Sequence, residues 1–380
     1  MGENRNSNTE VPFFGVPREF EEYGQEYMEA VSTVLSHGKV LQGKEVHALE
    51  TDIAEFCGRT HGVAVNSGTD ALFFALVAAG IEPGDEVLVT AFSFVASASC
   101  IVRLGAVPVF VDIGNDCNMD LKDAEHKITD RTKAMIFVHL YGRMSDPQAI
   151  QEFTSSHDLV SIEDAAQAFG ATRKGARAGS LGQVSCLSFD PTKVIGAPGS
   201  GGMLLTDNAH IAEHVQKLRY HGKNESGEYE CLGYNSQMPS ATAAILRCKF
   251  QHHDDWLARR RRIADYYTEN LKDCCQVPAD PEDGSHIFHK YVIRCAGRDK
   301  VKQQLTSHGI KTMVHYPSPL PEQLCFQSGN TSTSGCPKAY AIADQVLSLP
   351  MHPFLKNGEL EQVVDIVRIC AESPPSNITP

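Results

Sequence analysis

Lys193 is a residue whose surroundings in the sequence could make its side chain chemically reactive. It lies in the stretch SFDPTKVIGAPGSGG, residues 188–202, between a short apolar run and a turn rich in glycine and proline. A lysine becomes nucleophilic when burial makes its charged form costly. The stretch lacks the G-x-x-x-x-G-K-[ST] order of a nucleotide-binding P-loop. Taken alone, it is better explained by an ordinary surface lysine beside a glycine turn.

Two further polar groups also follow predicted strands. The stretch NSGTDAL, residues 66–72, ends a strand and opens a helix, where free N–H groups and the helix dipole can bind phosphate. Gly68 would let a ligand approach the backbone, and Thr69 is a common helix-capping type. Asp164 and Gln167 follow the strand-like LVSI. Helix capping explains each of these two groups equally well when it is considered alone.

One ligand needs all three groups together. Pyridoxal phosphate requires a phosphate site such as a helix start, an acid partner for its ring nitrogen, and a lysine for its aldehyde. Parallel sheets bind ligands beyond the carboxyl ends of their strands, where all three groups are expected to lie. The sequence therefore predicts a pyridoxal phosphate site built from this helix start, Asp164 and Lys193.

The elements that must position this site alternate between strand and helix from about residue 62 to 206. Short apolar strands separated by helices are typical of a parallel sheet covered on both faces. We expect strands at residues 61–66, 85–92, 107–113, 133–142, 159–166, 183–190 and 201–207. This is an α/β fold with a mainly parallel central sheet covered by helices.

The chain changes character after Asp207. The pattern predicts a helix to about residue 220, a polar loop over 221–238 and one long helix over 239–271. Strand-like pieces at 289–296 and 310–317 flank a helix at 298–309, and a helix over 357–372 closes a smaller C-terminal α+β domain. We therefore divide the chain into a tail, a large cofactor-binding domain, a small domain and a second tail, at 1–15, 16–250, 251–372 and 373–380.

Composition limits the partners of the chain. Its 380 residues are 42% hydrophobic and 21% charged, as in globular proteins. The net charge of −13 disfavours a general nucleic-acid or anionic-membrane partner, since both need a basic surface. No apolar run reaches membrane-spanning length, and the first residues lack the apolar core of a signal peptide. The 12 cysteines form no C-x-x-C pair, which predicts reduced thiols in the cytoplasm and no metal site.

The order and spacing of the motifs resemble the DegT/DnrJ/StrS family of sugar aminotransferases, which have the aspartate aminotransferase fold, fold type I of the pyridoxal phosphate-dependent transferases. The resemblance extends from about Phe14 to about Ile369. It implies transfer of an amino group from an amino acid, expected to be L-glutamate, to a keto-sugar. The matching stretches are VLQGKEVHALE, VAVNSGTDAL, GDEVLVTAFSFVASAS, GAVPVFVDI, VHLYG, IEDAAQAFGA, SFDPTK, GSGGMLLTD, GYNSQM, HKYVIR, VHYPSPL and LSLPMHP.

The resemblance also implies the cofactor contacts. Lys193 would bind the cofactor aldehyde and act as the base, and Asp164 would pair with the pyridine nitrogen. Gln167 is expected near the ring hydroxyl, and Phe94 on the face of the ring. The implied phosphate contacts are Gly68, Thr69, Ser188 and, from the neighbouring subunit, Asn235. A homodimer with shared sites is therefore expected.

The substrate contacts are less well defined by the motifs. A sugar carried on a nucleoside diphosphate would need local cations or backbone donors, because the chain as a whole is acidic. The candidates are Arg219, Tyr220, His221 and Lys223 for the diphosphate, and His315 and Tyr316 for the sugar.

Two positions depart from the family pattern. Asp190 stands where family members usually have His, Tyr or Asn, and Gln237 replaces a common arginine. These departures leave the acceptor open between a nucleotide-linked keto-sugar and a keto-cyclitol or other free ketone. Family members that dehydrate sugars have histidine in place of the lysine, so Lys193 argues against that reaction. A regulatory protein without turnover is a further alternative, which the intact Lys193, Asp164 and Gln167 disfavour.

Overall fold

The computed structural model describes residues 10–279, 283–327 and 335–370. Its centre is a seven-stranded sheet with the order β1-β9-β8-β5-β4-β2-β3. Every strand runs parallel to the others except β9, which is antiparallel to both of its neighbours. This confirms the predicted α/β fold with a mainly parallel sheet. The strands are β1 (His61–Val65), β2 (Glu86–Thr90), β3 (Val107–Val111), β4 (Thr132–Val138), β5 (Val160–Asp164), β8 (Val184–Ser188) and β9 (Gly202–Thr206).

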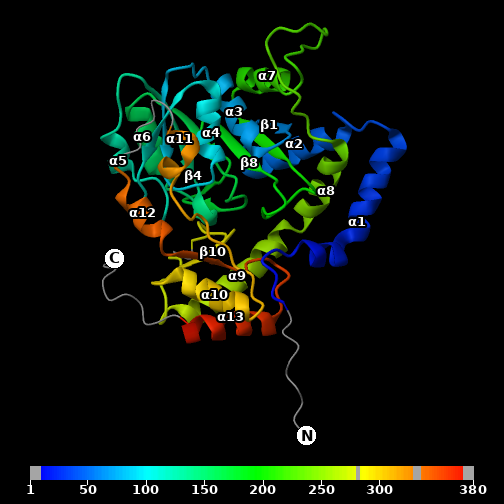
Figure 1. The fold of residues 1–380 in the computed structure, drawn as a ribbon. Coiled ribbons are helices and arrows are strands. Elements are labelled where there is room, and N and C mark those ends of the chain that lie inside the picture. Colours follow the sequence, from blue (N-terminus) through cyan, green and yellow to red (C-terminus); the bar gives the residue numbers. More distant parts are fainter. Residues whose placement is uncertain (1–9, 280–282, 328–334, 371–380) are drawn as a thin grey trace.

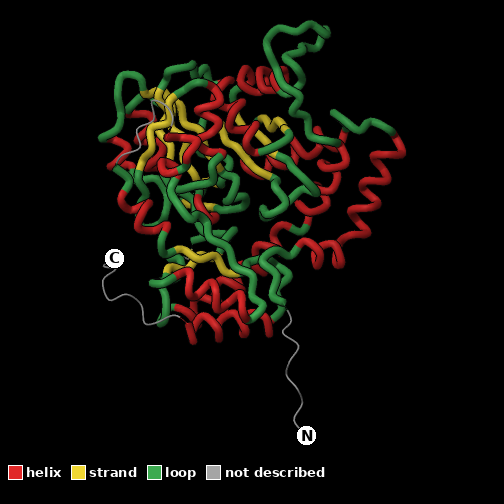
Figure 2. Tube along the Cα trace, in the orientation of Figure 1, coloured by secondary structure: helices red, strands yellow, loops and turns green. Residues whose placement is uncertain are grey.

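Helices cover both faces of this sheet (Figure 2). Side chains alternate between the faces, as the pleat requires; in β2, Val87 and Val89 join one core and Leu88 joins another. The first face packs against α3 (Gly68–Ala78), α4 (Ala96–Leu104) and α7 (Ala209–Leu218). The second face packs against α2 (Lys44–Cys57), α5 (Leu121–Glu125), α6 (Pro147–Ser156) and α8 (Ser240–Gln251).

The C-terminal part has a core of its own, seen below the central sheet in Figure 1. Its two-stranded antiparallel sheet pairs β10 (Tyr291–Arg294) with β11 (Val346–Leu349). Around it lie α9 (His253–Leu271), α10 (Arg298–Ser307) and α13 (Asn357–Cys370). The N-terminal helix α1 (Val16–His37) packs along α8. The shorter elements are η1 (Leu140–Gly142), β6 (Thr172–Arg173), β7 (Ala176–Arg177), η2 (Leu320–Glu322), α11 (Leu324–Gln327) and α12 (Pro337–Ala343).

Two expectations about the C-terminal part were wrong in detail. The helix expected over 239–271 is two helices, because α8 packs against α1 and α2 whereas α9 packs against α13. The stretch 310–317 forms isolated bridges at Ile310 and Met313 in place of a strand, and β11 lies beside β10 instead. Residues of α11 and α12 pack against the core on the first face of the central sheet, although they fall within the predicted small domain.

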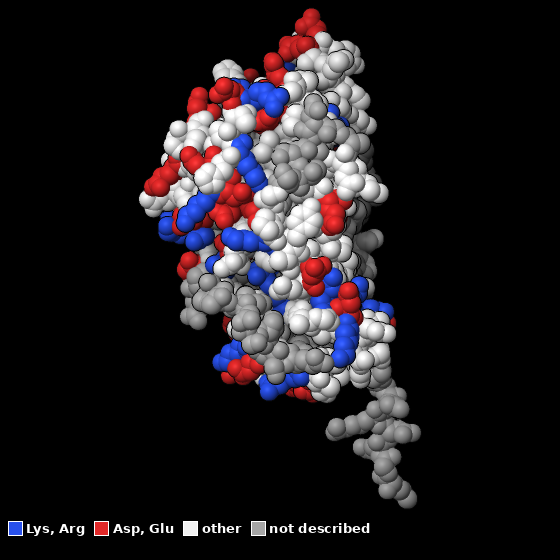
Figure 3. All heavy atoms as spheres, turned by 60° about the vertical axis from the view of Figure 1, so that its left-hand side comes forward, with Lys and Arg blue, Asp and Glu red and all other residues white. Residues whose placement is uncertain are grey.

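Several general features of the described residues bear on possible partners. No helix among them is long and apolar enough to cross a membrane. They contain no group of three or more His, Cys, Asp or Glu side chains that could hold a metal ion. On the face shown in Figure 3, acidic and basic side chains are interspersed. All 12 cysteines are free thiols.

Gly202, the first residue of β9, lies against the start of α3. A Cβ added here would lie 2.3 Å from the Ser67 carbonyl oxygen and 2.5 Å from the Gly68 nitrogen. We expect Gly202→Ala to lower the free energy of unfolding by about 1–3 kcal/mol, as overpacking typically does, measured by urea unfolding. The control is Gly358→Ala in α13, where an added Cβ meets nothing within 4 Å. Equal stability of the two variants would contradict this prediction.

Candidate active site

A cavity of about 580 Å³ lies at the carboxyl ends of the central strands. This is the edge of a parallel sheet where ligands usually bind. Its lining comes from the start of α3, the end of β5, the loop after β8 and the segments 289–290 and 313–316. The sequence-predicted residues that line it are Gly68, Thr69, Phe94, Asp164, Gln167, Ser188, Asp190, Lys193, His315 and Tyr316.

Asp164 is the last residue of β5 and only 5% exposed. The Ser97 hydroxyl donates to Oδ2 at 2.7 Å, and the Ala166 backbone N–H donates to Oδ1 at 3.2 Å. Burial raises the pKa of this carboxyl, and these hydrogen bonds and the charge of Lys193 oppose that rise. A cationic group placed in the cavity would therefore pair with Asp164.

Lys193 lies in the wall of the same cavity, in the loop between β8 and β9. Desolvation by burial lowers the pKa of its amine, whereas the charges of Asp164 and Asp190 act in the opposite direction. A lysine with a lowered pKa has more of the neutral amine that attacks an aldehyde. The position and the environment of Lys193 thus suit a covalent bond with pyridoxal phosphate.

The start of α3 forms a close-fitting cradle with the end of β8. The Ser67 hydroxyl caps the helix by accepting from the Asp70 N–H at 3.0 Å, which leaves the earlier N–H groups of the first turn for a ligand. A Cβ on Gly68 would lie 2.8 Å from Ser188 Cβ. Glycine is therefore needed at this position for the helix start to approach Ser188. The cradle has the donors and the close backbone approach that a phosphate requires.

Aromatic, imidazole and amide groups also line the cavity. Gln167 accepts from the Tyr141 backbone N–H at 2.9 Å, and its amide donates to the Tyr316 hydroxyl at 3.5 Å. Ser348 Oγ and His315 Nδ1 are 2.8 Å apart, and this contact holds the imidazole. Phe94 is 53% exposed at the edge of the cavity, with its ring centroid 6.4 Å from that of Tyr316. An exposed aromatic ring here can lie on the face of a planar cofactor.

The expectation that Arg219 contacts the substrate is not supported by its position. Arg219 is 6% exposed, and its guanidinium donates to the Ala64 carbonyl oxygen at 2.7 Å and to the carboxylate of Glu50. All of these groups are buried, so this arginine joins α2 and β1 to the segment after α7. A buried ion pair is costly to break, and Arg219 is therefore unavailable to a ligand.

Other predicted residues lie outside the cavity of their own chain. Asn235 is exposed and forms an isolated bridge with Tyr220. The Gln237 side-chain oxygen accepts from Gln42 at 2.7 Å. Between them, Ser236 donates to Asp70 at 2.7 Å, so this loop is fixed beside the start of α3. His221 and Lys223 also lie outside the residues that line the cavity.

Three residues that line or support this cavity were not predicted from the sequence. Ser97 opens α4 and holds Asp164, and a serine near the start of a helix at the carboxyl edge of the sheet was a usable signal. His289 and Lys290 line the cavity and are 2% and 6% exposed. They belong to the HKYVIR stretch, for which the sequence predicts a strand but no contact with a ligand.

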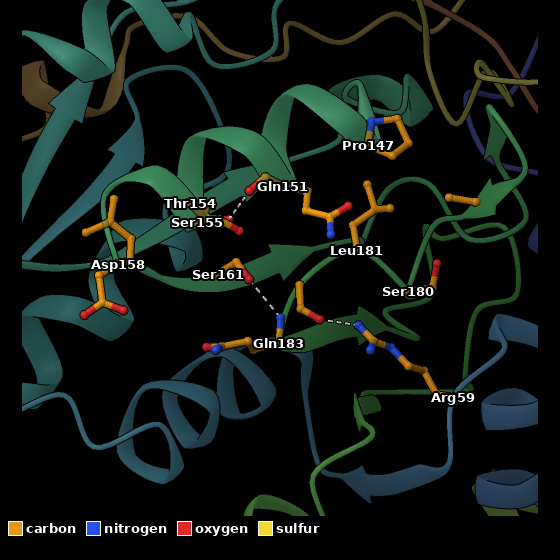
Figure 4. Close-up of a pocket in the computed structure, with 13 residues that line it drawn as sticks. Arg59, Pro147, Gln151, Thr154, Ser155, Asp158, Ser161, Ser180, Leu181 and Gln183 are labelled. Carbon is orange, nitrogen blue, oxygen red and sulfur yellow. Dashed lines mark hydrogen bonds between the residues drawn. The ribbon is translucent and has the colours of Figure 1, made fainter.

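A second hollow, of about 550 Å³, lies near the amino ends of β5 and β8 and is drawn in Figure 4. Some of its polar groups are bonded to the protein itself. Arg59 donates to the Gly179 carbonyl oxygen at 3.1 Å, and Ser161 accepts from the Gln183 N–H at 2.9 Å. Neither Lys193 nor Asp164 lines this hollow.

The model of the DegT/DnrJ/EryC1/StrS aminotransferase family matches residues 21–368. This chain belongs to that family. A pleiotropic regulatory protein of Geobacillus stearothermophilus is 42% identical over 360 residues, which cover 93% of this chain and 97% of that protein. A UDP-N-acetyl-3-dehydro-alpha-D-glucosamine 3-aminotransferase of Acidithiobacillus ferrooxidans is 38% identical over 363 residues, covering 95% and 98%. The crystal structure of S. venezuelae DesV has a TM-score of 0.92 at 36% identity, covering 96% and 99%.

The family assignment confirms the predicted cofactor. Family aminotransferases use pyridoxal phosphate, and related structures hold it in the aldehyde or the amine form. The chain is a pyridoxal phosphate-dependent aminotransferase. The cavity fits this group, since it combines the cradle at Gly68 with the buried carboxylate of Asp164 and with Lys193.

The charge of Asp190 raises the pKa of Lys193, so removing it should lower that pKa further. Uptake of the cofactor aldehyde needs the neutral amine. We therefore expect the pH dependence of pyridoxal phosphate binding to the cofactor-free protein to shift to lower pH in Asp190→Asn. The rate of binding can be followed by absorbance.

Asp254→Asn is the matched control, because the side chain of Asp254 is 93% exposed on α9. It should leave the pH profile of cofactor binding unchanged. A profile of Asp190→Asn that coincides with wild type, or that shifts to higher pH, would show that Asp190 does not tune this amine.

Proposed function

We propose that the protein transfers an amino group from L-glutamate to a keto-sugar carried on a nucleoside diphosphate. The observation that carries this proposal is the meeting of Lys193 and Asp164 in one cavity of a chain from this family. Relatives that align along most of the chain bear the names of aminotransferases or transaminases of UDP- and dTDP-linked sugars. Their names support the choice of a nucleotide-linked acceptor.

Each site residue has a role in this proposal. Pyridoxal phosphate, when bound, supplies an aldehyde that takes up the amino group and a ring that accepts electrons from the reacting carbon. Gly68, Thr69 and Ser188 would hold its phosphate. Asp164 would keep the proton on the ring nitrogen, and Lys193 Nζ would move a proton to and from the carbon that bears the amine. Gln167 and Phe94 would fix the orientation of the ring, and His315 and Tyr316 would face the sugar.

A regulatory role without turnover is the second candidate function. It is favoured by the name of the Geobacillus stearothermophilus relative, a pleiotropic regulatory protein. The groups needed for turnover are nevertheless all present in this cavity, namely Lys193, Asp164 and Gln167. A protein that had lost turnover would have no need of a lysine with a lowered pKa beside a buried carboxylate. We therefore favour catalysis.

A panel of acceptors tests the proposal. Purified protein with pyridoxal phosphate and L-glutamate is assayed against nucleotide-linked keto-sugars, free keto-sugars and keto-cyclitols, with 2-oxoglutarate formation as the readout. We expect amination of at least one nucleotide-linked keto-sugar and none by Lys193→Ala. Amination of a free keto-cyclitol alone would contradict the nucleotide-linked acceptor, and turnover of no acceptor would favour the regulatory role.

We also propose that the protein acts as a homodimer in which each site takes a residue from both subunits. Asn235 is exposed and outside its own cavity, where it is free to contact a second copy. The projecting loop between α7 and α8, at the top of Figure 1, exposes large apolar groups. Tyr229 is 72% exposed and Leu232 is 94% exposed. Burial of such side chains would stabilise an interface.

The cytoplasm is the compartment that we propose for this protein. The thiols support this proposal, because all 12 cysteines are unpaired and several are buried in the core. Disulfides would be expected more often in an oxidising compartment.

Subunit complementation tests the shared site. Lys193→Ala and Asn235→Ala are each expected to lack most activity, but a hybrid dimer carries one site with both residues intact. Mixing the two variants under conditions of subunit exchange should therefore restore activity, up to about a quarter of the wild-type value if pairing is random. The control mixes Lys193→Ala with Asp164→Ala, which affect the same site and should show no such gain. Absence of rescue with exchange demonstrated by mass spectrometry would contradict the shared site.

A further inference from the structure

Lys290 is a buried lysine in the active-site cavity. None of the proposed contacts with the cofactor involves it. It lies next to β10, in the HKYVIR stretch, and lines the same cavity as Lys193 and His315. Only 6% of the residue is exposed. Its Nζ lies 5.1 Å and 4.8 Å from the ring centroids of Phe13 and Phe14. Within the described residues, no hydrogen-bond acceptor or carboxylate pairs with this Nζ.

The surroundings of Lys290 make an unpaired ammonium costly. Desolvation lowers its pKa well below the ordinary value, and the charges of Lys193 and Arg260 lower it further. Asp190 acts in the opposite direction, but no ion pair joins the two side chains in the described structure. His289 and His315 also line the cavity, and burial and nearby cations lower the pKa of both, which favours their neutral form, so neither can act as a counter-ion for Lys290. An anion entering the cavity would supply the missing partner.

The groups proposed to bind the cofactor do not include Lys290. Asp164 and the cradle around Gly68 suit its ring nitrogen and its phosphate, and Lys193 suits its aldehyde. Lys290 lines the same cavity, together with His289 and Tyr316, and none of the cofactor contacts is assigned to it. Lys193 and Lys290 line this cavity together, and both also line a smaller hollow beside it. An anionic group attached close to the reacting carbon would therefore reach Lys290.

We propose that Lys290 Nζ binds a substrate carboxylate, and this inference rests on the proposed aminotransferase function. Two substrates could supply that carboxylate. The amino-acid donor carries one on the carbon that bears the amine, and a keto-sugar of the uronic acid type carries one on its ring. Lys290 is thus a specificity-determining residue that favours anionic substrates over neutral ones of the same shape.

The test compares Lys290→Met with Lys290→Arg in the holoenzyme. Methionine keeps the length and removes the charge, whereas arginine keeps the charge. Absorbance of the cofactor follows each half-reaction separately: L-glutamate with the aldehyde form, and neutral or carboxylate-bearing keto-sugars with the amine form. Calorimetry measures binding of glutarate, an unreactive dicarboxylate. Lys272→Met, at an exposed position after α9, is the control.

If the donor supplies the carboxylate, Lys290→Met should need about 10- to 100-fold more L-glutamate for half-maximal rate and bind glutarate correspondingly less tightly. Lys290→Arg should stay closer to wild type, and half-reactions with neutral keto-sugars should not change. If the sugar supplies it, the same loss should appear only with carboxylate-bearing keto-sugars. Unchanged half-reactions and glutarate binding in Lys290→Met would overturn the proposal.

Two further readouts separate a binding role from a structural one. Replacing an unpaired buried cation by methionine should leave the thermal midpoint unchanged or higher, and cofactor affinity should not change. If Lys290→Met does not fold, Lys290→Gln takes its place with the same expectations. Glutarate binding also distinguishes a failure of the Lys290 proposal from a failure of the proposed aminotransferase function. It tests Lys290 even if no keto-sugar is aminated.

Discussion

The buried carboxylate of Asp164 is the constraint on which the site depends. Burial raises its pKa, and the hydrogen bonds from Ser97 and Ala166 compensate only in part for the lost solvent. Such a group is retained at low exposure when a cationic partner offsets its desolvation. We propose that the pyridine nitrogen of the family cofactor, in its protonated form, is that partner. Because Asp164 ends a strand in the middle of the sheet, the partner must bind at the carboxyl edge.

The remaining site groups follow from that placement. β8 lies beside β5, so the chain that leaves β8 brings Ser188 and then Lys193 to the same edge. β9 returns antiparallel between β8 and β1, and its first residue, Gly202, touches the turn that starts α3. The cradle and the lysine are thus held by one block of adjacent strands. The residues proposed to face the substrate come from segments far along the chain, at 289–290 and 313–316.

Local signals in the sequence were sufficient to predict that the residues proposed to hold the cofactor lie in one cavity. Gly68, Asp164 and Ser188 each lie at the end of a strand or in the turn that follows it, and the alternation of strands and helices placed those ends together. The segments proposed to face the substrate could not be predicted in this way. Apolar residues at 310–317 indicated a strand, but their partners are the N-terminal segment and β11, which only the tertiary structure brings together.

Long-range pairing also explains the two misjudged cations. Arg219 looked like an accessible group in a polar segment, but Glu50 of α2 fixes it in the interior. Lys290 looked like an ordinary strand residue, and its burial depends on Phe13 and Phe14, which approach from the start of the chain. Neither contact leaves a local signal in the sequence. The sequence shows that both side chains are cationic, but it does not show whether they are accessible to a ligand.

The central claim is that Asp164 makes the bound cofactor an electron acceptor at Lys193. The most direct measurement is the rate at which L-glutamate converts the aldehyde form of the cofactor to the amine form, followed by absorbance in wild type and Asp164→Ala. Asp255→Ala, on the surface of α9, serves as the control. The account predicts a loss of several orders of magnitude in Asp164→Ala, with the cofactor still attached to Lys193 after borohydride reduction. A rate like that of wild type would contradict it.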